Sequence, residues 1–171
     1  IFFFWTKFCK LPEFPKKILV IRFDHAGDMV MTTPLVRALK EQFSEAKISV
    51  LCRPFVTDLV DTNKNVGEVY SFEPPWFSRG ESMGWLSTLS FLLNLRKQNF
   101  DIIIEPHADP RNIFAAFLAG GFRVGFGVRG FGFLLNKVLN YDASAHQIKK
   151  NLAFAQFLGA KCSEKLSVVL S

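Results

Sequence analysis

Asp28 is the residue whose type and position best fit a catalytic role. It lies in "ILVIRFDHAGDMVMTTPLVRALK", residues 18–40, where an apolar run is followed by a small-residue step and then an acid. Ala26 and Gly27 permit a tight turn from strand to helix, which would place Asp28 in the first helical turn, where backbone N–H groups and the helix dipole favour an anion. Such a carboxylate stays ionised and could act as a base. The alternative, which the residues alone favour, is a helix cap.

A second polar loop, "EPHADPRN" at residues 105–112, follows another apolar run. It contains Glu105, His107, Asp109 and Arg111. Pro110 suits the first position of a helix, so Arg111 would lie at a helix N-terminus and could hold an anionic group. The alternative is a capped helix with a solvated charge cluster.

The segment "GFGVRG", residues 125–130, formally matches GxGxxG. A dinucleotide site also needs a helix that opens on the third glycine and an acid about 20 residues later. The sequence instead continues with "FGFLLNKVLNYD", rich in Gly and Phe. We therefore expect a flexible loop that presents Arg123 and Arg129, and keep a nucleotide-binding domain only as a minor alternative.

Short apolar runs alternate with helical patterns, which predicts an α/β fold. Several runs are apolar throughout, as in parallel strands that are covered on both faces. The fold class expected is a doubly wound, mainly parallel sheet with Rossmann-like topology, whose ligands bind beyond the carboxyl ends of the strands. Both polar loops should then face each other across one cleft. Strands are expected at residues 17–23, 47–52, 68–72, 101–105, 123–126 and 166–170, and helices around residues 35–43, 85–98, 111–120 and 145–158.

Composition narrows the class of protein. The chain has 171 residues and a net charge of +6, with basic residues scattered along it. This suits an anionic partner but shows no nucleic-acid-binding motif. Three separated cysteines indicate a reducing compartment, and neither they nor the three histidines have metal-ligand spacing, so no metal or cofactor is expected. Residues 1–15 form an aromatic and basic segment that either packs on protein or anchors at a membrane interface.

Three segments together resemble glycosyltransferase family 9, the ADP-heptose:lipopolysaccharide heptosyltransferases. They are "KKILVIRFDHAGDMVMTTPLVRALKEQF", "FDIIIEPHADPRNIFAAFLAGGFRVGFGVRGFGFLLN" and "HQIKKNLAFAQFLGA", which together extend over about residues 16–160. The resemblance implies the N-terminal half of a GT-B fold, in which this domain binds the phosphorylated inner core of lipopolysaccharide and a second domain binds the ADP-sugar. Glu105, where Asp is commoner, and His25 depart from the family pattern.

The resemblance also implies roles for single residues. Asp28 takes the position of the catalytic base, which deprotonates the acceptor hydroxyl during an inverting transfer, and Gly27 lets the acceptor approach the backbone. Arg111 takes the basic position after the fourth long strand, while Arg53, Arg123 and Arg129 are further candidates for contacts to acidic sugar or phosphate.

The domain organisation expected is a segment at residues 1–15, an acceptor-binding domain at residues 16–165, and the start of a linker to a donor-binding domain at residues 166–171. Without a donor site this chain alone is expected to be inactive. We expect it in the cytoplasm, peripherally at the inner face of a bacterial inner membrane, with a lipid-linked phosphorylated oligosaccharide as partner. The rival is a non-catalytic module that binds anionic glycolipid or assembles with a separate donor-domain chain.

Overall fold

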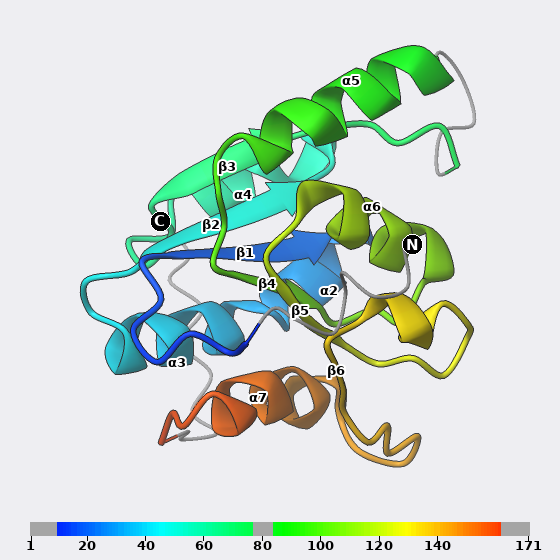
Figure 1. Cartoon of the computed structure of the whole chain (residues 1–171). Helices are drawn as coiled ribbons and strands as arrows, with labels where there is room; N and C mark the ends of the chain where they lie inside the picture. The colour runs from blue at the N-terminus through cyan, green and yellow to red at the C-terminus, as the bar shows by residue number, and fades with distance from the viewer. Residues whose placement is uncertain (1–9, 77–83, 162–171) are drawn as a thin grey trace.

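The structure is a computed structural model that describes residues 10–76 and 84–161. Its sheet contains six parallel strands in the order β3-β2-β1-β4-β5-β6 (Figure 1). The strands are β1 (Lys17–Arg22), β2 (Lys47–Cys52), β3 (Glu68–Ser71), β4 (Ile102–Glu105), β5 (Phe122–Gly125) and β6 (Lys137–Val138). The order reverses direction between β1 and β4, which makes this pair of strands the topological switch point.

Helices cover both faces of the sheet. They are α2 (Ala26–Val30), α3 (Thr33–Gln42), α4 (Thr57–Asp61), α5 (Trp85–Arg96), α6 (Pro110–Ala119) and α7 (Gln147–Phe157), with 3-10 turns η1 (Pro54–Val56) and η2 (Gly132–Leu134). One core cluster joins α3 and α7 to one face, and a second joins α5 and α6 to the other (Figure 1). The doubly wound α/β fold is therefore confirmed.

Alternation along β1 explains why this strand is apolar throughout. Ile18 and Val20 contribute to the core under α3 and α7, whereas Leu19, Ile21 and Phe23 contribute to the core under α5 and α6. All five side chains are fully buried, as expected for a central parallel strand. The loop that follows Phe23 is thus held at the carboxyl edge of the sheet from both sides.

Five of the six predicted strands are present, with ends that differ by a residue or two. The sixth, at residues 166–170, lies outside the described residues. Strand β6, helix α4 and the two 3-10 turns were not predicted. The segment at residues 125–130 follows β5 as expected, but the element after it is the short turn η2, so no helix opens on its third glycine.

Candidate functional site

The two polar loops lie side by side at the switch point, because β1 and β4 are neighbouring parallel strands. They are also in direct contact: Nδ1 of His107, in the loop after β4, lies 2.8 Å from Oδ2 of Asp24, in the loop after β1. The two loops therefore share the carboxyl edge of the sheet, as expected, and meet there through this contact.

Asp28 is the third residue of α2, and the N-cap position is occupied by His25. The interpretation of Asp28 as the cap is therefore wrong. Its carboxylate instead reaches back to the end of β1, where Oδ1 lies 3.3 Å from Nη2 of Arg22. The Asp28 side chain is 29% exposed. Its carboxylate therefore contacts the buried Arg22 on one side and the solvent on the other.

Arg22 carries the charge that organises this loop. Its side chain is 2% exposed, and its Nε lies 2.9 Å from Oδ2 of Asp24, itself 4% exposed. The contact lacks hydrogen-bond geometry, so it is an ion pair rather than a hydrogen bond. One guanidinium thus faces both Asp24 and Asp28, and losing it would leave a buried carboxylate uncompensated.

Sequence reasoning missed Arg22 and Asp24 as site residues. A signal was available: Arg22 stands between Ile21 and Phe23 in a strand expected to be covered on both faces. A charged residue there must be paired, and the nearest acids that follow it are Asp24 and Asp28. The apolar pattern alone could not show that His107, from a loop far along the chain, shares the same carboxylate.

Glu105 stabilises the loop after β4 from its buried side. Its carboxylate is fully buried at the end of β4 and accepts hydrogen bonds from the backbone N–H groups of His107 at 3.1 Å and Ala108 at 2.9 Å. These bonds hold Ala108 in the left-handed region, with φ of 65°. Burial, only partly offset by these donors and by nearby His107 and Arg22, raises the pKa of Glu105 to about 7.

Because that pKa is raised, the folded chain keeps a proton on Glu105 that the unfolded chain has already lost. Stability contributed by this group is therefore full below about pH 4.5 and falls as the pH rises to about 7. Glu105→Gln carries no charge but turns an NH2 group toward one of the two backbone donors, so we expect it chiefly to remove the loss of stability between pH 5 and pH 8, on the order of 2–3 kcal/mol. Urea unfolding at pH 5 and pH 8 would measure this.

Glu105→Leu is the contrasting variant, because it removes both the charge and the acceptor. It should destabilise the chain at both pH values by leaving the N–H groups of His107 and Ala108 unpaired. A Glu105→Gln chain that loses as much stability between pH 5 and pH 8 as wild type does would contradict the proposed burial cost.

Arg111 lies at the second position of α6, which confirms that it is at a helix N-terminus. Its guanidinium is engaged by the helix cap: Nε and Nη2 bind the two carboxylate oxygens of Asp109 at 3.0 and 2.7 Å, and Nη1 donates to the carbonyl of Trp76. This pairing lowers the pKa of Asp109 despite its burial. The Arg111 side chain remains 48% exposed at the loop surface.

The other predicted arginines are not all brought to this site. Arg53 directly follows β2 at the same sheet edge and forms an ion pair of 2.8 Å with Glu73. Arg129 is exposed in the loop after β5. Arg123 belongs to β5 itself and is 5% exposed, because its guanidinium donates to the carbonyls of Gly121 and Leu134. The expectation that a loop presents Arg123 is therefore wrong.

Gly27 contacts solvent rather than protein. A Cβ atom added at Gly27 would meet no heavy atom within 4 Å, and the residue does not require a positive φ. Neither packing nor backbone conformation therefore requires a glycine there, in contrast to Gly121, where an added Cβ would lie 2.5 Å from the Phe100 carbonyl oxygen. The backbone at Gly27 is open to a molecule from outside.

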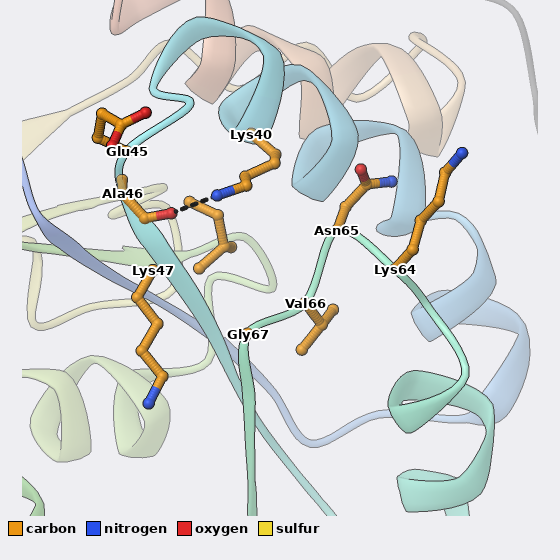
Figure 2. Close-up of a pocket in the computed structure, with 9 residues that line it drawn as sticks. Lys40, Glu45, Ala46, Lys47, Lys64, Asn65, Val66 and Gly67 are labelled. Atoms are coloured by element: carbon orange, nitrogen blue, oxygen red, sulfur yellow. Dashed lines mark hydrogen bonds between the residues drawn. The ribbon is translucent and has the colours of Figure 1, made fainter.

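A small cavity of about 250 Å³ lies elsewhere, between the starts of β2 and β3 (Figure 2). Lys40, Lys47 and Lys64 contribute to its lining, and Lys40 donates to the carbonyl of Ala46 at 3.0 Å. These residues mark the amino edge of the sheet, opposite the loops after β1 and β4. The described residues hold no cluster of three or more metal-ligating side chains.

Comparison with known proteins supports a glycosyltransferase relationship, although no protein-family model matches the chain. A stretch of 79 residues is 27% identical to lipopolysaccharide heptosyltransferase 3 of Escherichia coli, which covers 46% of this chain and 22% of that protein. A glycosyl transferase family 9 structure from Veillonella parvula has a TM-score of 0.75 at 19% identity, over 94% of this chain and 47% of that one.

The structure of Escherichia coli ADP-heptose lipopolysaccharide heptosyltransferase II has a TM-score of 0.68 at 25% identity, over 81% of this chain and 40% of that chain. The chain thus spans about half the length or less of the proteins it matches. These proteins are glycosyltransferases, and the similarity in both sequence and fold confirms the resemblance of this chain to glycosyltransferase family 9.

Proposed function

We propose that this chain is the acceptor-binding domain of an inverting glycosyltransferase that transfers heptose from ADP-heptose to the phosphorylated inner core of lipopolysaccharide. The observation that carries the proposal is the position of Asp28, a partly exposed carboxylate at the switch point, held from behind by a buried arginine. The related heptosyltransferases supply the reaction class. The domain would form half of a GT-B fold.

Asp28 is proposed to act as the general base. Arg22 contacts Oδ1, which leaves Oδ2 to accept the proton of an acceptor hydroxyl. As that O–H bond breaks, the hydroxyl oxygen forms a bond to the anomeric carbon, and the bond from this carbon to the diphosphate oxygen breaks with inversion. The leaving group departs as ADP with the electron pair of that bond, and the proton stays on Asp28.

Residues 16–165 are proposed to form the acceptor domain, and residues 166–171 the start of a linker to a donor-binding domain. A base contributes little where nothing holds and neutralises the leaving diphosphate. The 171-residue chain alone should therefore show no turnover. The rival function is a non-catalytic module that binds anionic glycolipid or pairs with a separate donor chain. Such a module would use the same carboxyl edge of the sheet for binding but would not need Asp28 as a base.

Arg111, Arg129 and Arg53 are proposed to contact acidic or phosphate groups of the acceptor. Arg53 and Arg129 lie in loops, and Arg111 in the first turn of α6, at the carboxyl edge of the sheet. Gly27 would let the acceptor approach the backbone of α2, in keeping with the open space beside it. The remaining predicted contact, Arg123, has its guanidinium in hydrogen bonds to the carbonyl groups of Gly121 and Leu134.

A peripheral position at the inner face of a bacterial inner membrane is proposed from the lipid-linked nature of the acceptor. Among the described residues, no helix is long and apolar enough to span a bilayer. Residues 1–9 of the N-terminal segment lie outside the described residues, while Phe14 in the same segment is 81% exposed. Deleting residues 1–15 should weaken binding to anionic vesicles if this segment is the anchor.

Binding measurements on the chain test the function directly. We expect calorimetry to show binding of a phosphorylated inner-core saccharide and none of ADP. Gly27→Val should fold with unchanged stability, because the space beside Gly27 is empty, but should bind the saccharide at least about tenfold more weakly through steric exclusion.

The matched control is Gly84→Val, since an added Cβ there also meets no heavy atom within 4 Å and Gly84 lies at the N-cap of α5 rather than in the loop after β1. It should leave saccharide binding unchanged. Tight binding of ADP by the chain, or unaltered saccharide affinity in the Gly27 variant, would argue against the acceptor site.

A further inference from the structure

The charged side chains at the switch point form two layers, one buried and one more exposed. Three carboxylates lie beneath the surface: the side chains of Asp24 and Asp109 are 4% and 8% exposed, and Glu105 is fully buried. Two cationic groups lie above them, His107 at 27% exposure on Asp24 and Arg111 at 48% on Asp109. The proposed function gives Arg111 and Asp28 roles but leaves His107, the less exposed group of the outer layer, without one.

The orientation of His107 is fixed from behind. Its Nδ1 lies 2.8 Å from Oδ2 of Asp24, the oxygen that also receives Arg22 at 2.9 Å, and its backbone N–H donates to Glu105. Because Nδ1 is committed to Asp24, Nε2 is the nitrogen left for an outside ligand. The close contact with the Asp24 carboxylate raises the pKa of His107, and it outweighs desolvation and charge repulsion from Arg22, which both oppose protonation.

The groups that face His107 favour its cationic form. Asp24 comes from the loop after β1, Glu105 from the end of β4, and Asp109 from the start of α6, while Arg22 at the end of β1 is the opposing cation. The contact with Asp24 is the largest of these effects, and it favours the cationic form of His107 relative to a free imidazole. An imidazolium can only donate, so its Nε2–H suits an anionic acceptor atom.

We propose that His107 is a second ligand-contacting residue of this site, whose imidazolium donates from Nε2 to a phosphate group on the saccharide acceptor. The inference rests on the proposed function and deepens it. Asp24 then acts as a positioning residue, which fixes the imidazole ring and keeps it charged. Asp24 also contacts Arg22, and Arg22 contacts Asp28. The phosphate-binding histidine and the proposed base are therefore linked by contacts that pass through one buried carboxylate, that of Asp24.

Sulfate binding to the 171-residue chain tests the proposal, because sulfate keeps a constant charge over the pH range of histidine titration. The ring protons of His25, His107 and His146 would be followed by NMR at constant ionic strength, with chloride as the reference salt. We expect sulfate to raise the apparent pKa of His107 alone, and its affinity to fall about tenfold per pH unit above that pKa.

Two variants sharpen this result. His107→Gln can still donate to Asp24 but carries no charge, and it should bind sulfate weakly with no pH dependence. Asp24→Asn should shift the pH window of sulfate binding downward, which a residue of merely structural importance would not do. His146→Gln is the control, because it removes a histidine that caps α7 and does not contact Asp24, and it should bind as wild type does.

Sulfate affinity that does not depend on pH, or that is unchanged in His107→Gln, would overturn the assignment of His107. This outcome would be distinct from a failure of the proposed function, which is judged by saccharide transfer and by the role of Asp28. With the saccharide itself, removal of its phosphate should abolish the difference between wild type and His107→Gln, and a persisting difference would also overturn the phosphate contact.

Discussion

Replacement of Asp28 by Asn in an active enzyme that contains this domain is expected to lower kcat by about 10²- to 10⁴-fold, the usual contribution of a general base. Asparagine matches the shape of the carboxylate but cannot accept the hydroxyl proton. Because Asp28 is partly exposed and only one of its oxygens faces Arg22, the acceptor KM and the fold should change little. Steady-state transfer kinetics and thermal unfolding would measure both effects.

Asp58→Asn provides the matched control for this variant. Asp58 is an exposed acid in the first turn of α4, which, like α2, has five residues and follows a parallel strand of the sheet. Neutralising it alters the same kind of helix terminus without touching the switch point, so kcat should stay at the wild-type value. Undiminished turnover in Asp28→Asn would remove the base from the mechanism and favour the non-catalytic binding module.

Arg22→Met is expected to destabilise the chain by about 3–5 kcal/mol, the range for breaking a buried ion pair from one side. Methionine fills much of the volume of the arginine stem but leaves Asp24, 4% exposed, beside an apolar side chain. His107 alone then compensates that carboxylate. Urea unfolding at pH 7 would measure the loss, and the unchanged slope with denaturant would show that the folded state remains compact.

The cost should arise from the orphaned charge rather than from lost packing. The double variant Arg22→Met with Asp24→Asn should therefore lose less stability than the sum of the two single variants. Lys47→Met is the control, because its ion pair with Glu68 is exposed and worth at most about 1 kcal/mol. A loss below that value in Arg22→Met would show that the guanidinium is not the organising charge.

The sheet was largely predictable because its central strands are covered on both faces. In β1 and β4 nearly every side chain is buried, so the sequence is continuously apolar and its limits are visible. Strand β6 has only two residues, Lys137 and Val138, and both are exposed. Such a strand leaves no apolar pattern, since backbone pairing with β5 rather than burial defines it.

The site was predictable in its parts but not in its connections. Strand and helix patterns placed Asp28 and Arg111 at one sheet edge, because the carboxyl ends of parallel strands share that edge. They did not show that His25 occupies the cap position of α2, and the pairing of Asp28 with Arg22 was missed although a charged residue in a covered strand was a signal for it. The contact of His107 with Asp24 could not be foreseen, because it depends on packing between segments distant in the sequence.

Arg123 was predicted to be an exposed contact residue, but it is buried. A basic residue beside a glycine-rich segment suggested a loop contact, yet its guanidinium is buried among carbonyl groups that the chain brings together at Gly121 and Leu134. A buried arginine of this kind satisfies backbone acceptors that would otherwise be unpaired. The strand predicted at residues 123–126 contained Arg123 and excluded Arg129, but the sequence pattern did not show that the Arg123 side chain would be buried.

Amide chemical-shift mapping of the chain with the phosphorylated inner-core saccharide tests the central claim most directly. If the switch point is the acceptor site, the largest shifts should fall on Gly27, Asp28 and His107, and should weaken in Gly27→Val. Shifts concentrated instead around Lys40 and Lys64, which line the cavity at the opposite sheet edge, would contradict the account.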